Sequence, residues 1–336
     1  MLTLTGAPST VVYTLLLRQV EGGENTLQVD DAPEHHATTE LTGVEHTYTS
    51  LEKDGPPDII FISSDGTPLY AHRAQLCVVS NNNFDLLLTP SIIDLPSTIE
   101  LTEDVHTLSV ILHVIYGASF DPYTPTLGAL SDAINAFDKY GLAPCSRVSP
   151  GTPVFEEVTK SISRHPLETY TIAAEHDLFD IAQKASEHLL TFPLSTISDD
   201  VVLRLGSIYL HRLFTLQLAR TYVLQNLIIR PPDKHDANTQ CGRQESESMK
   251  LAWIAAASPL VLAAHPDVST ETIQNKFECV KTSLHCAECR HCVERRVDEV
   301  LWKWSITPRT ICRDTRELYV ALSPLDRTRG TMISHL

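Results

Sequence analysis

The sequence predicts an α+β protein in which a small sheet is followed by a long helical region. Asp58–Ile62 is a β-branched and aromatic run of strand length, and Leu69–Ala71 returns after a turn at Asp65–Gly66. Beyond residue 104, apolar residues recur at the three-to-four-residue spacing of amphipathic helices. These two patterns place the sheet near the N-terminus and helices in the remainder of the chain.

The elements after the hairpin follow from start and stop signals. Residues 72–79 favour a short buried helix, and Ser80 is a candidate N-cap for a further helical turn. Ile99–Leu101 alternates as a brief strand. Asp104–Tyr116 carries apolar residues at i, i+3, i+4 and i+7, and Gly117 is placed to end that helix.

Six positions mark this order of hairpin, short helices, strand and longer helix: Asp58, Gly66, His72, Leu76, Phe84 and Tyr116. The marked run resembles a BTB/POZ domain, and more narrowly the stand-alone BTB proteins of mushroom-forming fungi. The resemblance implies a BTB/POZ fold over residues 55–142, with a small three-stranded mixed sheet packed with a helix cluster. An all-helical C-terminal region is expected to follow it.

Proline, glycine and polar clusters divide the rest of the chain. Residues 1–54 are acidic and threonine-rich, and we expect a largely disordered arm because they offer little apolar surface to offset ordering entropy. Residues 143–230 resemble the helical extension of BTB proteins. A polar linker at 231–246 precedes a helical region at 247–320, and 321–336 form a tail.

The charge balance excludes several classes of partner. A formal net charge of −16 argues against nucleic-acid binding and against adhesion to an anionic membrane. Arginines between residues 290 and 316, Arg296 among them, alternate with carboxylates and predict a solvated mixed-charge face. No apolar stretch is long enough to span a bilayer. Eight cysteines in a chain of 336 residues indicate reduced thiols, and hence a cytoplasmic or nuclear protein.

A cysteine cluster interrupts the last helical pattern. The apolar face before Leu284 and the one after Val293 are out of phase, so either one helix is buried on two sides or the chain turns between them. The cysteine spacing suits structural zinc, whereas the competing interpretation is small apolar residues packed in a helix. The candidate ligands are Cys279, Cys286, Cys289 and Cys292, with His285 or His291 as an alternative fourth ligand.

No nucleophile, phosphate-binding or dinucleotide-binding motif is present, which predicts a protein that is not an enzyme and has no small-molecule substrate. We expect His72 to make a hydrogen bond within the core rather than to act in catalysis.

The resemblance instead implies a protein-protein interaction module, in one version a substrate adaptor for a cullin-type ubiquitin ligase. Ile92 and Asp94 occupy about the place of the family's cullin-contacting apolar–x–acidic motif, although the family favours Glu. Self-association is an alternative mode of binding. A monomeric or weakly associating protein is left open too, because residues 1–54 show no clear equivalent of the N-terminal strand and helix that many BTB dimers exchange. Two alternatives stay open: a transcriptional or scaffold regulator without its own DNA-binding domain, and a zinc-stabilised helical domain with an unknown ligand.

Overall fold

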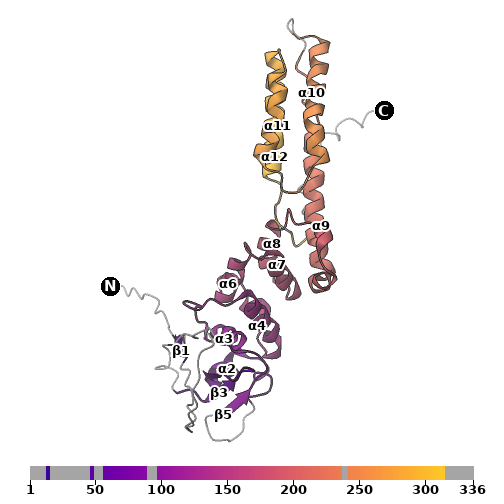
Figure 1. Ribbon diagram of the computed structural model, residues 1–336. Coiled ribbons are helices and arrows are strands. Elements are labelled where there is room, and N and C mark those ends of the chain that lie inside the picture. Colours follow the sequence, from indigo (N-terminus) through magenta and orange to yellow (C-terminus); the bar gives the residue numbers. More distant parts are fainter. Residues whose placement is uncertain (1–12, 16–45, 49–55, 89–96, 237–240, 315–336) are drawn as a thin grey trace, which may run out of the picture. The chain divides into compact units, whose positions relative to one another are not determined.

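The computed structural model describes residues 13–15, 46–48, 56–88, 97–236 and 241–314 (Figure 1). Over these residues the protein is mixed α+β, as predicted, with a small three-stranded sheet and eleven α-helices. The chain divides into two compact units, Met1–Val158 and Thr159–Leu336. Every helix in the described ranges is too short or too polar to cross a membrane.

The three-stranded sheet of the first unit is mixed. The central strand β3 (Ile59–Ile62) pairs antiparallel with β4 (Pro68–Ala71) and parallel with β5 (Ser97–Glu100). Ile59 and Phe61 point into the core because alternate residues of a strand face one side. The predicted hairpin and third strand are therefore confirmed.

Two further strands are described within the N-terminal arm. β1 (Tyr13–Leu15) pairs antiparallel with β2 (His46–Tyr48). The rest of residues 1–54 lies outside the described residues, so the disorder expected there stays a prediction.

The helix that follows Asp104 ends at Gly117 as predicted, and Asp104 is its N-cap rather than its first residue. The Asp104 carboxylate accepts the backbone N–H of Thr107 at 2.7 Å, and Gly117 adopts the left-handed conformation (φ 62°) that ends the helix. The helices of this unit are α2 (Arg73–Val79), α3 (Val105–Tyr116), α4 (Leu127–Lys139), α5 (Pro144–Arg147) and the start of α6 (Pro153–Ser161).

Two expectations for residues 72–88 were wrong. Helix α2 buries only Leu76, and Val78 is 82% exposed, so α2 is a surface helix rather than a buried one. The turn after Ser80 is not a right-handed helix, because all four residues of 83–86 have positive φ. Ser80 does cap this turn, since its Oγ accepts the backbone N–H of Phe84 at 2.7 Å.

Phe84 is the central side chain of the first unit. Its ring is fully buried and stacks on Phe61 at 5.2 Å and on Tyr140 at 4.2 Å between ring centroids. The Tyr140 hydroxyl donates to Glu103, which also accepts a hydrogen bond from Lys139 Nζ at 2.7 Å. The turn at 83–86 thereby joins the sheet to α4.

Truncating this ring is expected to destabilise the first unit. Phe84→Ala should lower the free energy of unfolding by about 3–5 kcal/mol, because it removes buried area and leaves a cavity. Leu86→Ala is the matched control two residues away, since Leu86 is exposed. Chemical unfolding followed by far-ultraviolet circular dichroism measures both. Equal midpoints for the two variants would contradict the central role of Phe84.

The second unit is entirely helical in its described residues. Pro166 is the first residue of α7, where a proline is tolerated, and the chain turns at His176–Asp177 between α7 and α8. Helix α9 breaks at Gly206 (φ 65°, ψ 168°). The helices of the second unit are α7 (Pro166–Glu175), α8 (Phe179–Glu187), α9 (Asp199–Ile229), α10 (Arg243–Leu262), α11 (Thr270–Thr282) and α12 (Ala287–Ser305), with a 3-10 turn at Leu194–Thr196.

Helices α9 to α12 pack on one another around one apolar core (Figure 1). Trp253 stacks on Phe277 with 4.0 Å between ring centroids, and its indole N–H donates to the Ile228 carbonyl at 2.8 Å. The phase break in the sequence is a turn, because α11 ends at Thr282 and α12 begins at Ala287. The two apolar faces thus belong to two helices of one bundle.

Arg296 differs from the solvated arginine that the charge pattern predicted. Its guanidinium is buried and donates to the carbonyls of Leu227 at 2.8 Å and Arg230 at 3.2 Å, while Glu299 accepts a third hydrogen bond at 2.6 Å. The prediction was wrong here because the last carbonyls of α9 need donors, and a cation at a helix C-terminus supplies them.

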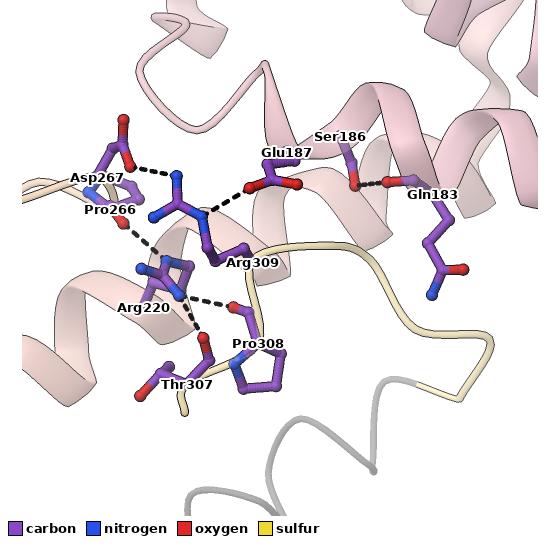
Figure 2. Close-up of polar contacts among 9 residues, drawn as sticks. All are labelled: Gln183, Ser186, Glu187, Arg220, Pro266, Asp267, Thr307, Pro308 and Arg309. Atoms are coloured by element: carbon purple, nitrogen blue, oxygen red, sulfur yellow. Dashed lines mark hydrogen bonds and ion pairs between the residues drawn. The ribbon is translucent and has the colours of Figure 1, made fainter. Parts of the chain in front are cut away.

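A second buried arginine holds the chain that follows α12. Arg220, only 2% exposed, donates to the carbonyls of Pro266 at 2.7 Å, Thr307 at 2.7 Å and Pro308 at 2.8 Å (Figure 2). Its guanidinium lies 4.3 Å from the Trp304 ring centroid. The guanidinium of Arg220 therefore links α9 to the α10–α11 loop and to the residues that follow α12.

Two ion pairs of Arg309 lie next to these hydrogen bonds and link the same chain segment to α8 and to the α10–α11 loop. Arg309 pairs with Glu187 at 2.8 Å and with Asp267 at 2.7 Å (Figure 2). Burial and the nearby positive charge of Arg309 lower the pKa of Arg220 to about 10, so Arg220 is still charged at neutral pH.

Replacing Arg220 is expected to destabilise the second unit strongly. Arg220→Met should lower the free energy of unfolding by at least about 3 kcal/mol, because hydrogen bonds from a charged donor contribute about 1.5–3 kcal/mol each. Arg309→Ala, a variant of an exposed arginine in the same region, should cost about 1 kcal/mol or less. All three tryptophans lie in this unit, so tryptophan fluorescence in a urea titration measures it. Similar losses in the two variants would contradict the assigned role.

Candidate functional site

One cluster among the described residues brings together four side chains that could hold a metal ion: His235, Cys241, Cys286 and Cys289. The ligand atoms all lie within 4.8 Å of one another. Cys289 Sγ is 3.3 Å from His235 Nε2 and 3.5 Å from Cys241 Sγ, and Cys286 Sγ is 3.6 Å from His235 Nε2. The three cysteines are buried, and His235 is partly buried.

Two loops at the same end of the α9–α12 bundle supply these residues. His235 and Cys241 lie in the connection between α9 and α10, and Cys286 is the N-cap of α12 with Cys289 in its first turn. The Glu245 carboxylate of α10 accepts the backbone N–H groups of His285 at 3.0 Å and Cys286 at 3.1 Å. This contact fixes the start of α12 against the start of α10.

The imidazole of His235 is oriented by its own backbone neighbour. Nδ1 lies 2.6 Å from the Asp236 carbonyl oxygen, so Nδ1 carries the proton and Nε2 presents a lone pair to the sulfurs. The hydrogen bond to Asp236 also raises the pKa of His235. A ligand histidine needs this tautomer when Nε2 is the donor atom.

The three thiols differ in their electrostatic surroundings. Backbone N–H groups of Cys289 and Glu288 lower the pKa of Cys286, because they stabilise its thiolate at the start of α12. Burial raises the pKa of Cys241 and of Cys289. Sulfur and imidazole donors at this spacing form a soft, four-donor set.

The sequence-predicted ligands are only partly brought together. Cys286 and Cys289 are in the cluster, but Cys279 lies exposed on α11, where its thiol contacts the Lys276 carbonyl at 3.2 Å. Cys292 is buried in the bundle core one turn beyond Cys289, outside the cluster. The alternative ligands His285 and His291 are exposed.

Sequence reasoning missed His235 and Cys241 because both lie in the stretch taken as a polar linker at 231–246. Helix α10 begins at Arg243, inside that stretch. The available signal was a histidine and a cysteine six residues apart in a loop between two helices, about fifty residues before the Cys-x-x-Cys step. Antiparallel helical hairpins bring two such loops to one end of a bundle.

The marked residues of the first unit serve its architecture. The Asp58 carboxylate accepts the Arg73 backbone N–H at 2.7 Å, and Gly66 takes φ 80° in the hairpin turn. The Tyr116 hydroxyl accepts the His72 backbone N–H at 2.8 Å and lies 2.9 Å from His72 Nδ1, so His72 makes the expected hydrogen bond. Leu76 and Phe84 are core residues.

Ile92 and Asp94, the residues predicted to contact a cullin scaffold, lie outside the described residues. No family model matches the chain, and no curated protein or solved structure matches it. The likeness to BTB/POZ domains therefore rests on residues and element order alone.

Thiol reactivity is expected to follow burial. Brief alkylation of the native protein should modify the exposed Cys77, Cys145 and Cys279 first, whereas Cys286 and Cys289 should be protected because reagent cannot reach them. Peptide mass spectrometry after iodoacetamide treatment measures each site, and alkylation in denaturant is the control in which all eight react. Rapid native labelling of Cys286 or Cys289 would contradict this geometry.

Proposed function

We propose that the protein is a protein-protein interaction module of the BTB/POZ type, which binds partners rather than catalysing a reaction. The observation that carries the proposal is the order of elements in the first unit. A β3–β4 hairpin, the surface helix α2, a parallel strand β5 and the buried helix α3 follow one another as in the expected domain.

The polar groups at the marked positions support a binding role. The Asp58 carboxylate accepts the backbone N–H of Arg73, and the Tyr116 hydroxyl accepts the backbone N–H of His72. Glu103 accepts hydrogen bonds from Tyr140 and Lys139. These bonds hold strands and helices together and thereby occupy groups that a catalytic site would need to present to a substrate.

Exposed apolar side chains give further support. Val78 is exposed on α2, and Leu86 and Leu87 are exposed in the turn that follows it. On α9, Phe214, Leu218 and Tyr222 are more than half exposed at four-residue spacing, which puts them on one helical face. Gathered apolar residues on a surface are typical of proteins that bind other proteins.

The adaptor version of the proposal depends on Ile92 and Asp94. Binding of wild type to a purified cullin-type scaffold should weaken at least about tenfold, or about 1.4 kcal/mol, in Ile92→Ala/Asp94→Ala, because the variant removes an apolar contact and a charge. Isothermal titration calorimetry measures both affinities.

Leu203→Ala, an exposed apolar position on α9, is the matched control and should bind as wild type does. Equal affinities of wild type and the double variant would remove this loop from the proposal. Absence of scaffold binding by wild type would remove the adaptor version. Affinity capture with Val78→Asp and Leu86→Asp then tests the broader role, since loss of captured partners in these variants is the expected result.

A further inference from the structure

We propose that His235, Cys241, Cys286 and Cys289 form a structural zinc site that joins the α9–α10 connection to the start of α12. The proposal is independent of the BTB-type function, because all four residues lie in the second unit. It rests on the distances between the donor atoms, on their chemical types and on the groups that orient them.

The donor spacing matches a tetrahedron around zinc. Zn–S bonds of about 2.3 Å and Zn–N bonds of about 2.0–2.1 Å place two sulfurs roughly 3.8 Å apart and a sulfur and a nitrogen roughly 3.6 Å apart. The structure gives 3.5 Å for Cys241–Cys289, and 3.6 Å and 3.3 Å for His235 with Cys286 and Cys289. These three distances are close to the values expected around zinc, and all four donor atoms lie within 4.8 Å of one another.

The surrounding groups hold the donors in the required state. Asp236 fixes the proton of His235 on Nδ1 and leaves Nε2 free to bind. Cys286 is the N-cap of α12, and Cys289 lies in the first turn of the same helix, so one helix end presents both thiols. Glu245 accepts one hydrogen bond from the backbone N–H of His285 and one from that of Cys286, which fixes the backbone at the start of α12.

Two other interpretations explain less. A disulfide between Cys241 and Cys289 would need the sulfurs about 2.05 Å apart and would leave Cys286 and His235 without a role. Apolar packing accounts for Cys292, which lies in the core, but not for an imidazole nitrogen placed among three sulfurs. Three sulfurs and one imidazole are a closed ligand set of the kind that binds zinc in structural sites.

The site would close one end of the α9–α12 bundle. His235 and Cys241 lie about fifty residues before Cys286 and Cys289 in the chain, and the metal would bind both pairs at once. Because Cys241 directly precedes α10 and Cys286 begins α12, a bound ion fixes the entry of two core helices. Metal binding to the folded state then stabilises the second unit.

Metal analysis of the full-length chain tests the proposal. Protein purified under reducing conditions should contain one zinc per chain, and replacement by Co²⁺ should give the intense visible bands of tetrahedral cobalt with sulfur-to-metal charge transfer. Cys241→Ser and Cys289→Ser should lose the zinc. The matched controls Cys279→Ser and Cys292→Ser should keep it, because neither residue belongs to the cluster.

Two measurements keep the test decisive if the serine variants fail to fold. His235→Cys should retain the metal with stronger sulfur-to-cobalt charge transfer, since it converts the set to four thiolates. A chelator should lower the melting temperature of wild type, read by tryptophan fluorescence. Wild type without zinc or tetrahedral cobalt bands would overturn the proposal, as would a Cys241–Cys289 disulfide or zinc loss confined to the Cys279 and Cys292 variants.

Discussion

The apolar core between α9 and α12 depends on polar groups that close it at both ends. Trp253 and Phe277 fill its middle, but the loops at either end carry backbone groups that the core cannot satisfy. At the α10–α11 end, Arg220 supplies donors to three carbonyls. Arg296 supplies donors to the carbonyls at the end of α9, the end from which the connection carrying His235 and Cys241 leaves. Apolar packing holds the helices side by side, and the hydrogen bonds of Arg220 and Arg296 hold the chain at the helix ends.

In the first unit, aromatic stacking joins the sheet to the helices. Its sheet has only three strands, so it buries little surface and needs a helix cluster to complete a core. Phe84 connects the two parts, since its ring lies between Phe61 of the sheet and Tyr140 at the end of α4. Around this core, Asp58 bonds the backbone of Arg73 and Tyr116 bonds the backbone of His72, while Val78 and Leu86 remain exposed.

How far the sequence could predict the fold depends on how local each signal is. Helix α3 was predictable in full, because its cap, its apolar face and its terminating glycine lie within fourteen residues. The left-handed turn at 83–86 was not predicted, because Ser80 also suits a right-handed helix start and Phe84 packs on Phe61 and Tyr140, which lie far from it in the sequence. The same limit applied to Arg296, whose partners are carbonyls more than sixty residues away.

The sequence by itself determined the α+β class, the hairpin, the third strand and the helix that follows it, and two of the four candidate metal ligands. Those features follow from local spacing: period two in strands, three to four in helices, and the Cys-x-x-Cys step. Only the tertiary structure decided that His235 and Cys241 complete the cluster and that Cys279 does not. The physical reason is that antiparallel helices bring loops far apart in the chain to the same end of a bundle. The spacing of residues along the chain does not show which loops will lie together.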